Sequence, residues 1–217
     1  MVQRLLDAGA IAIGQTNLNQ FACGLSGTRS PHGACRNAFN PGFVSGGFSA
    51  GSAVSVALGH ASFSWGTDTT GSGRVPAGFN HLVGLKPTLG LLSAQSVVPA
   101  CCSLDTVSIF TLTAADAQQV LAEAHGFDAS DTYSRSAQLH GFDFGVAAAP
   151  RIGIPRADQL QFLGDQGYAA CFANALQHGQ ALPGNSQLHR QATGRRFPGH
   201  PANQPVTAPR PAPPSPR

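Results

Sequence analysis

The chain has 217 residues, 42% of them hydrophobic, which suits one folded domain, or one domain followed by a tail. Charged residues make up only 11%, and no apolar run reaches the roughly 18 residues that a membrane-spanning helix needs. The N-terminus lacks the long apolar stretch and small-residue cleavage site of a signal peptide. We therefore expect a cytoplasmic protein that is neither secreted nor bound to a membrane.

The formal net charge of +3 is unevenly distributed along the chain. Residues 181–217 hold five arginines, nine of the 16 prolines and no acidic residue, and without them the formal charge is −2. Arginines scattered among prolines with one aromatic residue are a weak indication of nucleic-acid binding. We therefore predict no nucleic-acid partner, a folded domain over 1–179 and a disordered Pro/Arg-rich tail over 180–217.

The first half of the chain is predicted to form short elements around a long loop. Residues 2–8 have apolar side chains at helical spacing, with Gly9 after them as a helix end, and AIAI at 10–13 is typical of a short buried strand. The elements expected after these are a brief helix at 17–23, a loop at 24–47, a helix at 49–59 and strands at 61–65 and 81–85.

The second half is predicted to continue the same alternation. Residues 105–112 alternate and are rich in β-branched side chains, so we expect a strand, followed by a helix at 114–124 with Thr113 as its N-cap. A strand at 151–155 and a helix at 165–178 follow. Strands alternating with helices indicate βαβ units, and hence an α/β fold.

The five cysteines are odd in number and contain no C-x-x-C spacing, so they indicate neither a zinc site nor a disulfide framework. We expect reduced thiols that serve as small hydrophobic side chains. The adjacent pair Cys101 and Cys102 has no evident partner base, and we expect both thiols to be buried and inert.

Two glycine-rich segments are candidates for the chemistry: SGGFSAGS at 45–52 and GTDTTGSGR at 66–74. In the second, Ser72 has glycine on both sides in a loop after a predicted strand. Small neighbours leave such a hydroxyl accessible, and successive backbone N–H groups of the loop can converge on a developing oxyanion. A phosphate-binding loop is the rival interpretation, but G-x-x-x-x-G-K-[ST] is absent.

Residues 45–59 together with GTDTTGSGRVPAGFNHLVGLKPT at 66–88 resemble the core of the amidase signature family. LLDAGAIAIGQTNLNQFACGLSGTRSPHGACRN, VVPACCSLDTVSIFTLTAADA and RIGIPRADQLQFLGD are similar to its allophanate hydrolase branch. The resemblance extends over about residues 1–178. It implies part of the amidase-signature fold, a mixed sheet flanked by helices.

The resemblance also implies a mechanism, in which a lysine, a serine in a cis peptide and a nucleophilic serine form a relay. Ser72 corresponds to the nucleophile, Thr69, Thr70 and Gly71 to the oxyanion hole, and Asp68 and Arg74 to residues that support the loop. The implied reaction is amide hydrolysis through an acyl-enzyme, in which allophanate gives ammonia and carbon dioxide. The implied pathway also includes urea carboxylase. The implied substrate is a small-molecule amide, and no metal or organic cofactor is implied.

The sequence departs from this pattern in the relay. Phe48 occupies the relay serine's position, which leaves Ser49 as a substitute. The family's lysine lies upstream of residue 1 when the patterns are matched, and the only lysine, Lys86, corresponds to a structural segment. We therefore expect a domain incomplete at both ends and impaired as an amidase. The alternative is an inactive fragment or pseudoenzyme that binds a partner, and its exposed apolar faces would favour self-association.

The sequence also allows other assignments of the general base and of the residues that would bind substrate. His60 or His81 could act as a general base for Ser72 with Asp68 as its partner, since histidine titrates near neutral pH. Arg29 lies in a loop where it could approach an anionic substrate or simply be solvated, and His32 in the same stretch stands where the family often has an aromatic residue.

Overall fold

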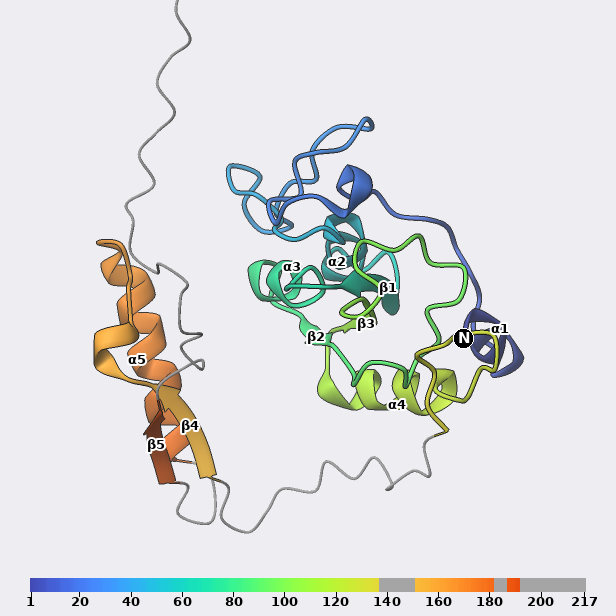
Figure 1. Ribbon diagram of the computed structural model, residues 1–217. Coiled ribbons are helices and arrows are strands. Elements are labelled where there is room, and N and C mark those ends of the chain that lie inside the picture. Colours follow the sequence, from blue (N-terminus) through green and yellow to red (C-terminus); the bar gives the residue numbers. More distant parts are fainter. Residues whose placement is uncertain (137–150, 182–186, 192–217) are drawn as a thin grey trace, which may run out of the picture. The chain divides into compact units, whose positions relative to one another are not determined.

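The computed structural model describes residues 1–136, 151–181 and 187–191 of the chain (Figure 1). The chain divides into two compact units, Met1–Asp143 and Phe144–Arg217. Both combine strands with helices, in agreement with the predicted α/β class.

The first unit is built on a three-stranded sheet with the order β1-β3-β2, in which β1 is Phe63–Asp68, β2 is Val83–Leu85 and β3 is Thr106–Thr111. The central strand β3 is antiparallel to both neighbours, so that Ile109 pairs with Trp65 on one side and with Leu85 on the other. The strands predicted at 81–85 and 105–112 are confirmed. The strand predicted at 61–65 begins two residues later and continues to Asp68.

Helices cover both faces of this sheet (Figure 1). They are α1 Val2–Asp7, α2 Ala50–Ala57, α3 Arg74–Phe79 and α4 Ala114–Ala124, with a short 3-10 helix, η1, at Gln20–Ala22. The predicted N-cap of α4 is confirmed, because the Thr113 side chain accepts a hydrogen bond from the Asp116 N–H at 3.1 Å. Helices α1 and α2 begin and end within a few residues of their predicted positions, and η1 lies inside the brief helix predicted at 17–23, whereas α3 was not predicted.

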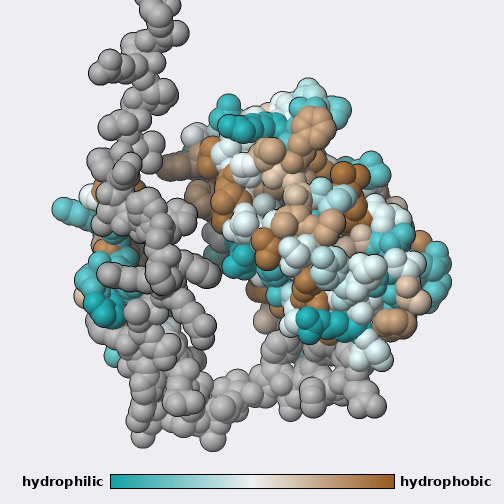
Figure 2. Space-filling view, viewed as in Figure 1, coloured by the Kyte–Doolittle hydropathy of each residue, from teal (hydrophilic) through white to brown (hydrophobic). Residues whose placement is uncertain are grey.

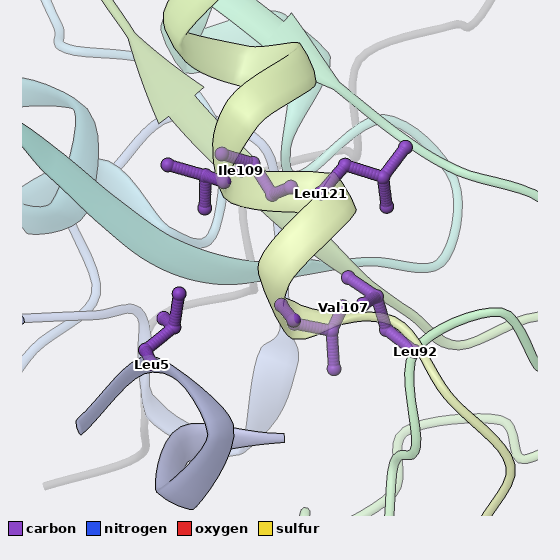
Figure 3. Packing of buried hydrophobic residues seen from close by; sticks show 7 residues of the cluster. Leu5, Leu92, Val107, Ile109 and Leu121 are labelled. Atoms are coloured by element: carbon purple, nitrogen blue, oxygen red, sulfur yellow. The ribbon is translucent and has the colours of Figure 1, made fainter. Parts of the chain in front are cut away.

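The core is organised by the alternation of side chains along β3. Val107 and Ile109 point to one face, where Leu5 of α1 and Leu121 of α4 pack against them (Figure 3). Phe110 points to the other face and packs against residues of α2 and α3. All six residues of β3 are buried, which explains why its sequence contains no charged residue and, apart from Ser108, consists of apolar and β-branched residues.

Two sequence-based expectations in this unit are wrong. Residues 10–13 form no strand, and Ile11 and Ile13 are 85% and 69% exposed, because the described chain offers this segment no neighbouring strand to pair with. Cys101 and Cys102 are also exposed, because the loop before β3 carries both on its surface. Figure 2 shows brown, hydrophobic areas on the visible face of this unit.

The second unit contains β4 Arg151–Pro155, the 3-10 helix η2 at Ala157–Gln159, α5 Gln166–Gln180 and β5 Gln187–Gln191. Strands β4 and β5 are parallel and are connected through α5, a βαβ arrangement. Within the tail predicted at 180–217, residues 187–191 pair with β4 as a strand. Residues 182–186 and 192–217 lie outside the described part. Across the described ranges, no helix has the length and apolar character to cross a membrane.

Candidate active site

The loop that carries Ser72 joins the last residue of β1 to the first residue of α3. Ser72 is 7% exposed. Its hydroxyl has no hydrogen-bond partner in the described part of the chain, and so no general base contacts it there. The predicted nucleophile is a nearly buried side chain with a free hydroxyl.

The carboxylate of Asp68 holds this loop in shape. It is fully buried and accepts hydrogen bonds from the N–H groups of Gly71 and Gly73 at 2.7 and 3.1 Å. The Arg74 N–H adds a third at 3.2 Å, and the Arg74 guanidinium binds both carboxylate oxygens, through Nε at 2.9 Å and Nη2 at 3.1 Å. Such two-point contacts between arginine and a carboxylate are strong and directional. One ionised side chain therefore fixes the loop around Ser72.

The charge state of Asp68 makes stability depend on pH. Burial alone would raise its pKa, but hydrogen bonds from Arg74 and Gly71 and the charge of Lys86 lower the pKa to about 2. Because this is below the unfolded value of about 3.9, the ionised group stabilises the fold above about pH 4, and this contribution is lost as the pH falls towards 2. Between about pH 4 and pH 2 we expect the free energy of unfolding to fall, and Asp68 to account for about 2.5 kcal/mol of this fall. Urea unfolding at a series of pH values measures it. An Asp68→Asn variant should lack this part of the decrease, and an unchanged pH dependence would contradict the assignment.

Lys86 is committed to structural contacts. Its Nζ lies 3.3 Å from Asp68 Oδ1, 3.2 Å from the Thr69 carbonyl and 3.5 Å from the Leu104 carbonyl. An ammonium has three N–H donors, and these three acceptors use all of them. A lysine held in this way is poorly suited to remove a proton from Ser72, so the structure favours the structural role expected for Lys86.

The predicted oxyanion residues, Thr69 to Gly71, do not all present their N–H groups to a ligand. The Gly71 N–H is directed to Asp68, and Gly71 itself has a φ of 137°, which favours glycine. In the described chain, the N–H groups of Thr70 and Ser72 have no protein partner. These two groups, together with the Thr69 N–H, which also has no partner among the described residues, are therefore donors that the loop has available for an oxyanion.

The substitute relay residue, Ser49, is engaged with β1. Its hydroxyl accepts a hydrogen bond from the Thr67 N–H at 3.0 Å and donates one to the Thr67 carbonyl at 3.3 Å. The side chain is buried and forms no hydrogen bond to Ser72. Phe48, which the resemblance matches to the family's relay serine, accepts the Asn19 N–H at its carbonyl and has no hydroxyl to offer. The structure does not bring Ser49 and Ser72 together as a hydrogen-bonded pair.

Glycine allows the two predicted segments to approach each other closely. A Cβ on Gly47 would lie 2.3 Å from Pro76 Cδ and 3.0 Å from the Ser72 carbonyl oxygen. A Cβ on Gly66 would lie 2.5 Å from the Ser49 hydroxyl oxygen. The glycine-serine segment at 45–52 thus packs directly on α3 and on the loop that carries Ser72. It has this packing role whether or not it takes part in the chemistry.

The alternative histidine arrangement has no support in the described residues. His60 and His81 are exposed, and neither ring forms a hydrogen bond to Ser72 or Asp68 there. His81 instead packs edge-on against Phe39, with ring centroids 6.4 Å apart. Arg29 and His32 are also exposed. No group of three or more potential metal ligands occurs within the ranges that the structure describes.

One contact in this region was not expected from the sequence. The Thr69 hydroxyl donates a hydrogen bond to Asp105, the buried residue that immediately precedes β3. An acidic residue at the start of a strand that has no other charged residue was the available signal, because a buried carboxylate needs partners.

The chain has a serine loop between a strand and a helix, anchored by a buried carboxylate, within a fold that solved structures named allophanate hydrolase and amidase share. The chain is 42% identical to Kluyveromyces lactis allophanate hydrolase, with a TM-score of 0.82 over 88% of this chain and 31% of that one. One subunit of the Thermotoga maritima glutamyl-tRNA(Gln) amidotransferase has a TM-score of 0.79 at 31% identity, over 88% of this chain and 42% of that one.

The chain belongs to the amidase family, whose model, described as Amidase, matches residues 1–182. It is 48% identical over 182 residues to urea amidolyase from Saccharomyces cerevisiae, covering 82% of this chain and 10% of that protein. It is 40% identical over 158 residues to the corresponding glutamyl-tRNA(Gln) amidotransferase subunit of Salinibacter ruber, covering 71% of this chain and 31% of that protein. The chain thus spans about a tenth to a third of these curated relatives.

Proposed function

We propose that this chain carries the nucleophile-bearing part of an amide hydrolase that acts on allophanate, with Ser72 as the nucleophile. The observation that carries the proposal is the loop anchored by Asp68, which presents a free serine hydroxyl beside the unpartnered N–H groups of Thr70 and Ser72. Similarity to allophanate hydrolase and urea amidolyase supports the choice of substrate, and a pathway that includes urea carboxylase.

In the proposed reaction, the Ser72 oxygen attacks the amide carbonyl carbon of the substrate, and its proton is transferred to the departing ammonia. The carbonyl oxygen becomes an oxyanion that the Thr70 and Ser72 N–H groups stabilise. Water then hydrolyses the ester formed with Ser72 and regenerates the hydroxyl. Asp68 and Arg74 shape the loop and do not touch the reacting atoms.

The same geometry predicts a slow reaction. Phe48 supplies no relay hydroxyl, Ser49 is engaged with Thr67, and Lys86 is engaged with three acceptors. An unassisted serine hydroxyl is a weak nucleophile, and loss of relay groups typically costs several orders of magnitude in rate. These contacts favour a second candidate function, a binding protein with the amidase fold but little or no activity.

Ammonia release from allophanate by the purified chain, compared with a Ser72→Ala variant, separates the two functions. For an impaired hydrolase we expect slow release that Ser72→Ala abolishes, because the variant lacks the attacking oxygen. The circular dichroism spectra and unfolding curves of both proteins should match, which controls for folding. If folded chain and folded variant release ammonia at the same rate, the hydrolase proposal is wrong and the binding function is supported.

A further inference from the structure

Thr69, the first residue of the loop after β1, is held at its side chain by Asp105. One carboxylate oxygen of Asp105 accepts the Thr69 hydroxyl, and the other accepts the N–H groups of Ala100 and Cys101, each at 2.8 Å. Asp105 is 6% exposed, so little water competes for these bonds. The Asp105 carboxylate is therefore itself fixed by the loop before β3, and cannot turn away from Thr69 without breaking two backbone contacts.

The backbone carbonyl of Thr69 is also held, by Lys86, which contacts the residue before Asp105 as well. Lys86 Nζ lies 3.2 Å from the Thr69 carbonyl and 3.5 Å from the carbonyl of Leu104, the residue before Asp105. In a planar trans peptide, the carbonyl and the following N–H point in opposite directions. Holding the Thr69 carbonyl against Lys86 therefore aims the Thr70 N–H away from Lys86.

We propose that Asp105 is a positioning residue for the oxyanion donors of this loop. By fixing the Thr69 side chain while Lys86 fixes its carbonyl, Asp105 sets the peptide plane whose N–H belongs to Thr70. This role rests on the proposed function of the loop, and adds a contact from the residue before β3 to the anchor supplied by Asp68. Preorganised donors of this kind lower the barrier because they need not reorient during the reaction.

The test replaces Thr69 with valine in the full chain, which keeps the shape of the side chain and removes only the hydroxyl. Thr69→Ser is the matched control, because it retains the hydroxyl. Hydrogen exchange of backbone amides, measured by NMR, reports on the loop through Gly71 and Gly73, whose N–H groups bind Asp68, and on the central strand through Ile109.

In Thr69→Val, we expect the Gly71 and Gly73 amides to exchange at least about tenfold faster, with Ile109 within about twofold of the unmodified chain. Thr69→Ser should exchange as the unmodified chain does. Asp105→Ala should also accelerate exchange at Gly71 and Gly73, and adding Thr69→Val to it should accelerate exchange no further, because the bond that Thr69→Val removes is already lost in Asp105→Ala. Where ammonia release is measurable, Thr69→Val should lower kcat about tenfold and change KM less than about twofold.

Unchanged exchange at Gly71 and Gly73 in Thr69→Val would overturn the proposal, as would equal acceleration in Thr69→Ser. Acceleration of all three amides together would also overturn it, since it would show a bond that supports only global stability. A chain that releases no ammonia from allophanate contradicts the proposed function alone, since the exchange rates in the unliganded protein still decide the role of Asp105.

Discussion

Replacing Asp68 with asparagine is expected to lower the free energy of unfolding by about 3 to 5 kcal/mol. The carboxylate lies at 0% exposure, and its partners include two cations, Arg74 and Lys86. An asparagine offers one acceptor oxygen in place of two and carries no charge, so both cations lose their counter-charge and part of the loop's N–H groups lose their acceptor. Urea unfolding near neutral pH, followed by circular dichroism, measures the change.

The matched control for this prediction is Asp7→Asn, the same substitution at an exposed carboxylate in the same unit. Asp7 accepts a hydrogen bond from Gln3 at 2.8 Å on the surface of α1, and such sites change stability by about 0.5 kcal/mol or less. A change in Asp68→Asn as small as that in Asp7→Asn would show that Asp68 is not the anchor of the serine loop.

Replacing Gly47 with alanine is expected to destabilise the first unit by about 2 to 5 kcal/mol. Two costs add: Gly47 has a φ of 67°, which an L side chain rarely adopts, and the new Cβ would overlap Pro76 of α3. Because Pro76 and Ser72 lie on either side of the start of α3, relief of this overlap would displace the helix that follows the nucleophile. The midpoint temperature of thermal unfolding and the Ser72-dependent activity should therefore both be lower in this variant.

Gly59→Ala separates the two costs. Gly59 has a φ of 73°, close to that of Gly47, but a Cβ there would meet no atom within 4 Å. We expect it to cost only the conformational part, about 1 to 2 kcal/mol. Equal effects of the two substitutions would mean that the contact between the glycine-serine segment and α3 is not tight.

Sequence patterns were reliable where one local preference and the tertiary environment agree. The helix at α4 combines an apolar stripe with the Thr113 cap, and β3 combines β-branched residues with complete burial, so both lie where they were predicted. The pattern failed at residues 10–13, because AIAI has the composition of a buried strand but becomes one only beside a partner strand.

The candidate site shows the same division. The sequence by itself predicted the family, which the family model confirms, and it pointed to the serine loop and to Phe48 in place of a relay serine, because these depend on residue identity and spacing along one segment. Only the tertiary structure decided that Lys86 is saturated by Asp68, Thr69 and Leu104, and that Asp105 reaches Thr69. The physical reason is that hydrogen bonds between residues 17 to 36 positions apart depend on how β3 lies against β1 and β2, and no local pattern encodes that arrangement.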